Sequence, residues 1–473
     1  MTTHDRPIDV LVLGGGISGL TAAHYLRGAG LSVALWESGD RVGGVIRSER
    51  QNGFLIEHGP NSTLDTTPLL RQLAREMHVI DRLIEANGEA NNRYILRDGE
   101  LRALPMSPPA FIRTPLFSAK AKLRLFAEPF IKPYRGTAPE TLADFVLRRL
   151  GREFLDYAIN PFVAGVYAGD PHRLEVSSAF PKLHALEQSY GSLIKGTIKG
   201  RKARKERAET SKQSAKMISF RDGLQTLTDA IGARLGDAVR TGVTVTRIER
   251  ADEAWRVRAT IAGEAVDLTA RAVLSTIPAH AVAELPFDFD LPVSADLAAI
   301  TYPPVTMVYT GYRGNPAGRP VDGFGYLIPE KEKRSILGTI WSSTVFTDRA
   351  PEGGVALTTF VGGMRQPEIA QLPADALLER VMAELRDLMG ITVEPDTVMI
   401  RPWPRAIPQY QPGHAAMVDR LAAAEFELPG LYFSGNYRGG ISVADCVKQS
   451  HAMSERIAAE LAERPVEAQQ RAG

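Results

Sequence analysis

The sequence contains one cysteine, Cys446, among 473 residues. A single thiol excludes an internal disulfide and a cysteine-rich metal site, and its simplest interpretation is a small buried apolar residue. No apolar run approaches the roughly 18 residues that a membrane-spanning helix needs, and Met1–Asp9 lacks the layout of a signal peptide. The histidines lack metal-ligand spacing, so no metal is predicted. These absences favour an unprocessed protein in a reducing, cytoplasmic compartment.

The chain is 44% hydrophobic and 23% charged, which allows a large core and two or more domains. Its net charge of +1 conceals one strongly basic run. Residues Lys195–Lys216 hold nine basic and two acidic side chains. The run contains no aromatic residue, so nucleic-acid binding has no support. A solvated loop is favoured over attraction to anionic lipid headgroups.

The first forty residues predict a strand-helix-strand unit. Ile8–Leu13 is a short continuous apolar run, typical of a strand buried on both faces. Leu20–Leu26 predicts a helix, and Leu31–Trp36 predicts a second buried strand that ends at Glu37. The turn between strand and helix is rich in glycine and consists of Gly14, Gly15, Gly16, Ile17, Ser18 and Gly19.

This glycine turn has the spacing of a dinucleotide-binding loop. Gly14 permits the tight turn, Gly16 lets the backbone approach a pyrophosphate, and Gly19 lets the helix pack closely on the sheet. The phosphates would meet the N-terminus of the helix, and Glu37 would accept hydrogen bonds from the adenosine ribose. The sequence therefore predicts a Rossmann-like nucleotide site.

Patterns further along the chain predict an α/β fold with several domains. Helical stretches such as Ala119–Phe126 and Thr141–Leu150 replace strands after about residue 113. Strand patterns return from Val243 and dominate Val305–Val361, and Gly430–Leu461 ends as strand, glycine loop and helix. We expect a discontinuous nucleotide-binding domain at 1–85, 215–285 and 395–473, a mixed-sheet domain at 86–112 and 286–394, and a helical insertion at 113–214.

Several glycines after the first unit favour FAD over NAD. Arg41-Val42-Gly43-Gly44 and Glu57-His58-Gly59-Pro60 suit close backbone approach by a flat cofactor. This order resembles the flavoprotein class that contains amine oxidases, carotenoid desaturases and protoporphyrinogen oxidases. In that class the carboxyl end returns to the flavin, and Leu431–Val443 looks like that segment. The helix after it would aim its N-terminal dipole at the flavin pyrimidine edge.

Within this class the chain resembles the protoporphyrinogen oxidase family over nearly its whole length. The matching stretches, in family order, are Asn92–Ile95, Phe162–Pro171, Ser219–Leu227, Leu337–Ser343 and Gly435–Cys446. Amine oxidases carry a Gly-Glu pair near the C-terminal strand, whereas this chain has Gly435-Asn436. That departure argues against amine oxidation.

The resemblance implies oxidation of protoporphyrinogen IX to protoporphyrin IX in heme biosynthesis, with FAD as cofactor and dioxygen as acceptor, which becomes hydrogen peroxide. It also implies a peripheral location at the inner face of the cell membrane, with the helical insertion as the membrane-binding domain. Phe111, Ile112, Leu116 and Phe117 near basic residues would suit that surface, and helix core suits them equally. Contact with a ferrochelatase and a homodimer are further expectations.

The family's residue roles map onto definite positions of this chain. Arg93 would pair with a substrate propionate. The backbone carbonyls of Ala168 and Gly169 would accept pyrrole N–H bonds, and Leu327 and Phe346 would sandwich the macrocycle. The expected FAD contacts are Gly14, Gly15, Gly16, Ile17, Ser18, Gly19, Glu37, Ser38, Arg41, Gly43, Gly44, Val45, Gly59, Pro60, Asn61, Ser62, Val245, Gly435, Ile441, Ser442 and Val443.

No side chain is predicted to act as a general acid or base. Hydride would leave a meso carbon for flavin N5, so positioning would carry most of the rate. The sequence leaves three alternatives open. The first is coproporphyrinogen III, which carries four propionates and would need extra basic residues around the cavity. The second is a carotenoid or amine oxidase, and the third is a flavin-binding scaffold without turnover.

Overall fold

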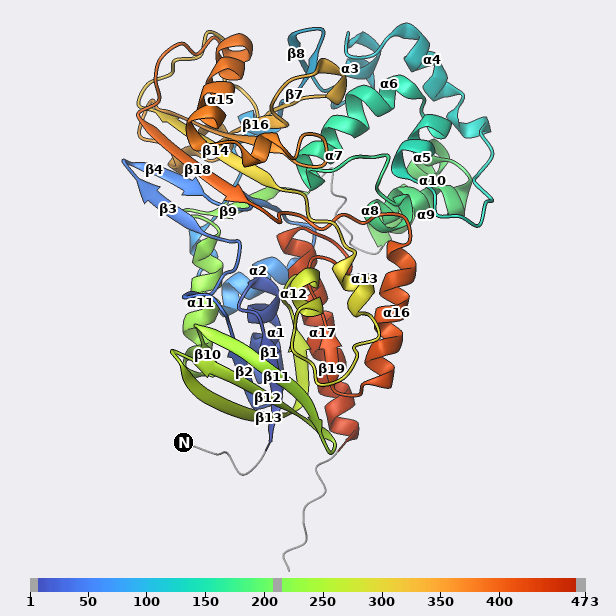
Figure 1. The fold of residues 1–473 in the computed structure, drawn as a ribbon. Helices are drawn as coiled ribbons and strands as arrows, with labels where there is room; N and C mark the ends of the chain where they lie inside the picture. Colours follow the sequence, from blue (N-terminus) through green and yellow to red (C-terminus); the bar gives the residue numbers. More distant parts are fainter. Residues whose placement is uncertain (1–6, 207–214, 465–473) are drawn as a thin grey trace, which may run out of the picture.

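The computed structural model describes residues 7–206 and 215–464. Its first sheet lies at the base of the molecule (Figure 1) and has the order β10-β2-β1-β13-β12-β11, with β19 also paired to β13. The strands are β1 (Ile8–Leu13), β2 (Val33–Trp36), β10 (Val239–Arg240), β11 (Val243–Ala251), β12 (Ala254–Ile261), β13 (Glu264–Ser275) and β19 (Leu431–Phe433). Parallel pairing of β1 with β2 and β13 confirms the predicted Rossmann-like fold.

The core of this first unit forms where helices from three distant segments cover the sheet. They are α1 (Ile17–Gly28), α2 (Pro68–Glu76), α11 (Gln225–Leu235) and α17 (Val443–Glu463). Residues of all four pack with β1 in one apolar cluster that includes Leu20, Leu70, Ile231 and Val447. The strand Ile8–Leu13 has its predicted bounds, because its apolar run is buried on both faces.

A second sheet stands above the first, with the order β18-β14-β17-β16-β15-β7-β8. Its strands are β7 (Arg93–Arg97), β8 (Glu100–Ala103), β14 (Val305–Tyr312), β15 (Gly325–Leu327), β16 (Gly338–Trp341), β17 (Val355–Gly362) and β18 (Thr397–Trp403). One face packs against α15 (Ala374–Met389) around Trp341 and Leu385. Because side chains alternate along a strand, Arg93, Ile95 and Leu327 share the opposite face.

Two small sheets connect these units. One pairs β3 (Ser48–Gln51) with β4 (Phe54–Glu57), and the other has the order β5-β9-β6. The latter's strands are β5 (Thr63–Leu64), β6 (Leu83–Glu85) and β9 (Met217–Phe220). Phe54 and Ile56 of β4 pack on Met307 and Tyr309 of the second sheet. This contact places the residues that follow β4 next to the face of the second sheet that does not pack against α15.

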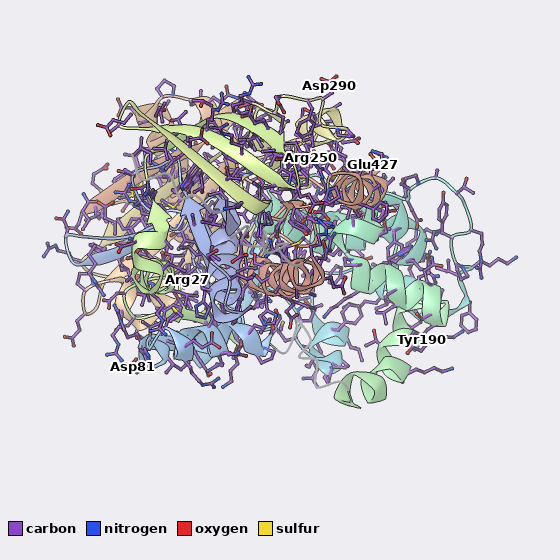
Figure 2. The ribbon with its side chains drawn as sticks, turned by 90° about the horizontal axis from the view of Figure 1, so that it is seen from below. Arg27, Asp81, Tyr190, Arg250, Asp290 and Glu427 are labelled. Atoms are coloured by element: carbon purple, nitrogen blue, oxygen red, sulfur yellow. The ribbon has the colours of Figure 1, made fainter. Side chains whose placement is uncertain are left out.

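The predicted helical insertion forms a separate group of helices at one side of the molecule. Figure 2 shows Tyr190 of this group on the side opposite Arg27 and Asp81. Its helices are α3 (Pro108–Arg113), α4 (Ala119–Phe126), α5 (Leu142–Arg149), α6 (Arg152–Phe154), α7 (Asn160–Tyr167), α8 (Val176–Ala179), α9 (Pro181–Tyr190) and α10 (Leu193–Glu206), with a π turn at Leu155–Ile159. α4 has its predicted bounds, and α5 is capped by Thr141, whose hydroxyl accepts the Asp144 amide.

The interior of this helical group combines apolar packing with buried charge. Phe145 and Leu155 belong to its apolar cluster. Arg149 is fully buried and forms ion pairs with Glu128 (3.0 Å) and with Glu187. Within the described residues, no helix is long and apolar enough to cross a membrane.

The division into three domains stays a prediction. β18 falls in the segment 395–473 but pairs with β14 of the second sheet. The basic run begins on α10, and residues 207–214 within it lie outside the described part of the chain. The remaining α-helices of the described residues are three short ones, α12 (Ala279–Ala283), α13 (Ser294–Ala298) and α14 (Ser342–Val345), and the longer α16 (His414–Glu427).

Candidate functional site

The glycine turn after β1 is shaped by close backbone contacts. Gly14 has a φ of +105°, a conformation that favours glycine. A Cβ on Gly19 would lie 1.9 Å from the carbonyl oxygen of Gly14, so only glycine lets α1 approach the strand. A Cβ on Gly16, in contrast, would meet no atom within 4 Å. The turn therefore packs tightly against the protein at Gly19 and faces open space at Gly16.

The start of α1 offers backbone donors to this open space. Gly16 occupies the N-cap position and has no side chain to satisfy the first amides of the helix. The first helical bond runs from the Leu20 amide to the Gly16 carbonyl. Free amides and the positive end of the helix dipole together form an anion site. Ser18 lies buried in this first turn, where its side chain bonds to the Cys446 thiol, whose pKa burial raises to about 11.

Glu37 supports the turn from the end of β2. One carboxylate oxygen accepts the Gly15 amide at 2.6 Å, and the other accepts the Gly39 amide at 2.7 Å. The hydroxyl of the exposed Ser38 lies 3.4 Å from the same carboxylate. Val243 donates its amide to the Glu37 carbonyl, which places the start of β11 beside Glu37, two residues before Val245. Both carboxylate oxygens of Glu37 thus bond to backbone amides, and the hydrogen bonds to an adenosine ribose stay a prediction.

The segment after β2 folds back onto the glycine turn. Gly43 donates its amide to the Gly15 carbonyl at 2.7 Å, and a Cβ on Gly44 would lie 3.2 Å from the Gly16 Cα. Arg41 holds this segment by donating to the carbonyls of Val42, Gly44 and Ile46. Its guanidinium is therefore engaged within its own loop, and the structure gives it a scaffolding role.

Residues after β4 lie against the same loop. A Cβ on Gly59 would lie 2.2 Å from the Val45 carbonyl oxygen, so this close approach requires glycine. Val45 is 53% exposed, so it presents apolar surface beside Gly59. Pro60 follows Gly59 and leads to Asn61, whose side-chain amide donates to the Gly59 carbonyl at 3.4 Å. The predicted contacts at 43–45 and 59–62 are therefore brought together.

His58 fixes this loop to the second sheet. Its carbonyl accepts the Trp403 indole N–H at 2.9 Å, and its imidazole bonds to Glu49 at 3.2 Å. Burial, reinforced by the nearby Arg47, lowers the pKa of His58. A neutral, internally bonded imidazole is suited to holding the loop in place.

The carboxyl-end segment returns to the glycine turn as the sequence predicts. Ser434 donates its amide to the Ser275 carbonyl, and a Cβ on Gly435 would lie 3.7 Å from the Thr276 carbonyl oxygen. Thr276 in turn bonds to the Gly14 carbonyl at 3.1 Å. Ile441 follows, and Ser442 caps α17 by accepting the Asp445 amide. The N-terminus of α17, at Val443, therefore starts on the side of the glycine turn.

One of the predicted substrate residues, Phe346, lies at a small cavity next to this loop system. This cavity is lined by Asn61 and Ser62, by Phe346, and by Leu55, Glu57, Phe324, Ile340, Ser342, Val345, Arg349 and Thr358. Predicted cofactor contacts and a predicted substrate contact thus line a single space. Arg93 lies next to Phe324 of this cavity, with its guanidinium 5.8 Å from the centre of the Phe324 ring. Within the described part of the chain, no carboxylate pairs with Arg93.

Ala168 and Gly169 form the end of α7, near Leu327. A Cβ on Gly165 of α7 would lie 2.5 Å from a Leu327 methyl group, so helix and strand touch there. Ala168 adopts a left-handed conformation with a φ of 49° and ends the helix. Its carbonyl accepts the Met364 amide at 2.7 Å, so it is already engaged within the protein.

Sequence reasoning missed the buried pair Glu57 and Arg349. The Arg349 guanidinium bonds to Ser219 Oγ at 2.8 Å and lies 3.9 Å from the Glu57 carboxylate. Burial raises the pKa of Glu57 and lowers that of Arg349. These residues lie far apart in sequence, and no local pattern signals their meeting at the cavity.

Comparison with known proteins places the chain in a family. The profile of flavin containing amine oxidoreductases matches residues 17–458. The chain belongs to the flavin-containing amine oxidoreductase family. It is 32% identical over 469 residues to protoporphyrinogen oxidase 2, chloroplastic/mitochondrial, of Arabidopsis thaliana, which covers 93% of this chain and 91% of the relative.

Two further relatives extend this comparison. Coproporphyrinogen III oxidase of Bacillus subtilis (strain 168) is 29% identical over 460 residues, covering 94% of this chain and 96% of that one. A crystal structure from Exiguobacterium sp. 255-15, assigned as a protoporphyrinogen oxidase, superposes with a TM-score of 0.80 at 26% identity and covers 96% of this chain and 99% of that one. As a member of this family, the chain is an FAD-dependent oxidoreductase.

The residues present fit FAD. Open space at Gly16, free amides at the start of α1 and the exposed Val45 form a cradle that a nucleotide pyrophosphate and a flat ring would fill. Among residues 7–206 and 215–464, no three His, Cys, Asp or Glu side chains gather as a metal site requires. The assignment of individual FAD and substrate contacts stays a prediction.

Proposed function

We propose that this flavoenzyme oxidises protoporphyrinogen IX to protoporphyrin IX. The observation that carries the proposal is one small cavity that the loop residues Asn61 and Ser62 share with Phe346, which follows α14 directly. Relatives named protoporphyrinogen oxidase from Arabidopsis thaliana and Bos taurus match over 93% and 95% of the chain. An apolar wall beside a flavin loop suits a large, largely apolar macrocycle.

Bound FAD supplies two-electron chemistry in which a hydride is accepted from the substrate. Protoporphyrinogen loses six electrons and six protons in becoming protoporphyrin, so three two-electron rounds are needed. With dioxygen as the acceptor, three molecules of dioxygen become three of hydrogen peroxide. This stoichiometry requires that the partly oxidised macrocycle stay bound, or rebind, between rounds.

The chain's own residues would orient the substrate. Arg93, which lacks a carboxylate partner among the described residues, would pair with a propionate at the rim of the cavity. Leu327 and Phe346 would contact the two faces of the macrocycle. Pyrrole N–H groups would bond at the end of α7, where the Gly169 carbonyl and the remaining lone pair of Ala168 are the candidate acceptors.

Coproporphyrinogen III is a second candidate substrate, supported by the Bacillus subtilis relative and by one further arginine. Arg401 of β18 pairs in register with Met307, whose side chain lies on the same face of the sheet as Leu327. Its guanidinium lies 4.7 Å from the Trp403 ring centre, and its Nε is buried without a partner within the described residues. A second unpaired cation would suit a substrate with four propionates.

Turnover on both porphyrinogens, followed by porphyrin fluorescence in air, tests the proposal. Faster formation of protoporphyrin than of coproporphyrin is expected, with hydrogen peroxide released in a ratio of three to each porphyrin. A higher kcat/KM for coproporphyrinogen III would reverse the order of the two candidates. No porphyrin from either substrate would refute porphyrinogen oxidation altogether.

We also propose that the helical insertion binds the inner face of the cell membrane. Leu123, Phe126 and Phe130 are exposed on it, Phe130 to 85%, and the Lys195 ammonium lies 6.0 Å from the Phe130 ring centre. Exposed aromatic and basic side chains together suit a lipid interface. Co-sedimentation with anionic vesicles should fall for Phe126→Ser/Phe130→Ser, and unchanged binding would contradict this. Ferrochelatase contact and a homodimer stay predictions.

A further inference from the structure

Residues Gln409–His414, here called the linking segment, end the connection between β18 and α16 and include the first residue of α16 (Figure 1). Gln409, Tyr410 and His414 within it are all buried. The Tyr410 ring stacks on the His414 ring with 4.0 Å between ring centres, and its edge meets Tyr167 at 6.1 Å. The linking segment therefore passes between the end of α7 and the carboxyl-end loop.

On one side, the linking segment holds the carboxyl-end loop. The Tyr410 hydroxyl donates to the Asn436 carbonyl and accepts the Gly440 amide at 2.9 Å. His414 bonds to the Tyr437 carbonyl at 2.8 Å. Gly440 has a φ of +135°, so the loop adopts a backbone conformation that needs outside support. A single phenol thus bridges both ends of the turn that precedes Ile441–Val443.

On the other side, the linking segment holds the end of α7. The Gln409 side-chain amide donates to the Tyr167 carbonyl at 2.8 Å. The Tyr410 carbonyl accepts the Glu175 amide at 2.7 Å, and the Glu175 carboxylate accepts the Gly413 amide at 2.9 Å. These bonds fix the turn at Ala168–Gly169, which follows Tyr167 directly.

We propose that Tyr410 is a positioning residue that holds the flavin-edge loop, Gly435–Val443, at a fixed distance from the substrate-facing turn Ala168–Gly169. This inference rests on the proposed function. The physical basis of the proposal is that the buried side chain of Tyr410 bonds to the loop, while the backbone carbonyl of Tyr410 accepts the amide of Glu175 in the helical insertion. The hydroxyl is the essential group, because phenylalanine would keep the ring contacts and leave the Gly440 amide and the Asn436 carbonyl unpaired.

Hydride transfer is sensitive to such a change, because a misplacement of about 1 Å can lower a rate by about 100-fold. Tyr410→Phe should therefore lower kcat by about 10- to 100-fold, with a smaller change in KM. The flavin absorption spectrum should shift, because the loop and the start of α17 face the cofactor. Amide hydrogen exchange of the peptide covering 435–443 should become faster.

Tyr437→Phe is the matched control in the holoenzyme. Tyr437 lies in the same loop and is equally buried, but its hydroxyl has no bonding partner within the described residues. Because its hydroxyl bonds to neither end of the loop, Tyr437→Phe should change the spectrum, the exchange rates and kcat much less than Tyr410→Phe does. Equal effects of the two substitutions would overturn the proposal, since burial of a phenol would then explain both. An unchanged spectrum and unchanged exchange in Tyr410→Phe would also overturn it.

The wild-type protein gives an independent measurement if Tyr410→Phe does not fold. The Gly440 amide should exchange as slowly as the neighbouring core amides, and fast exchange would refute the hydrogen bond to Tyr410. Failure of the proposed function is distinguishable, because it would appear as a wild-type protein that forms no porphyrin. The spectrum and the exchange rates would still decide the role of Tyr410.

Discussion

Gly16→Ala separates cofactor binding from folding more sharply than any other substitution in the glycine turn. Gly16 has a φ of −70° and a ψ of 177°, which alanine adopts without strain, and its added Cβ would meet no protein atom within 4 Å. The apoprotein should therefore fold normally. The new methyl group would instead occupy the space through which a pyrophosphate reaches the amides of α1.

The expected magnitude follows from these contacts. Alanine is a poorer N-cap than glycine, so apoprotein stability should fall by no more than about 1 kcal/mol. Loss of one charge-assisted hydrogen bond from phosphate to a backbone amide costs about 1.5–3 kcal/mol. The dissociation constant for FAD should rise by about 10- to 150-fold, because about 1.4 kcal/mol corresponds to a factor of ten.

Flavin retained after purification, FAD affinity from fluorescence titration and the melting temperature of the apoprotein would be measured together. Gly28→Ala is the matched control, because a Cβ on Gly28 also meets nothing within 4 Å but lies at the far, exposed end of α1. It should bind FAD normally and be slightly more stable. Wild-type FAD affinity in Gly16→Ala would refute this account of the cradle.

Three further predictions concern other parts of the molecule. Arg93→Ala should raise KM for the porphyrinogen and leave flavin content unchanged, and an unchanged KM would remove Arg93 from the substrate site. Burial lowers the pKa of His414 below its usual 6.5. As the pH falls through about 6.5, this histidine takes up a proton in the unfolded chain before it does so in the folded protein, so the free energy of unfolding decreases. His414→Gln should therefore show a smaller decrease in melting temperature between pH 7.5 and 5.5 than the wild type. Arg149→Met leaves Glu128 buried without its cation, whereas Glu187 keeps its ion pair with Arg148. Chemical denaturation should therefore show a loss of about 3–5 kcal/mol; a loss below about 1 kcal/mol, the range of exposed pairs, would contradict the importance of the Arg149–Glu128 pair.

Local sequence patterns predicted the parts of the site that are made by neighbouring residues. The strand Ile8–Leu13, the glycine turn and the helix Ala119–Phe126 follow from short runs of apolar and glycine residues, and they have the predicted form. The return of the carboxyl end was predicted from resemblance, and β19 does pair with β13. The strand, the glycine turn and the helix depend on spacing within a few residues, which a sequence displays directly, whereas the long-range return of the carboxyl end could be predicted only from the resemblance.

Contacts between distant segments could not be predicted in this way. The Ala168 carbonyl was expected to face pyrroles, but it also accepts an amide from Met364, 196 residues further along the chain. The Glu57–Arg349 pair and the bonds of Tyr410 likewise join segments that only the folded chain brings together.

Anaerobic reduction of the bound flavin by protoporphyrinogen IX tests the central claim most directly. The claim requires that the flavin loop and the proposed substrate residues face one common site. Mixing the purified holoenzyme with the porphyrinogen without oxygen should bleach the flavin absorption, and admitting air should restore it while porphyrin fluorescence appears. A flavin that stays oxidised with protoporphyrinogen IX and with coproporphyrinogen III, or is reduced equally well by a simple amine, would contradict the account.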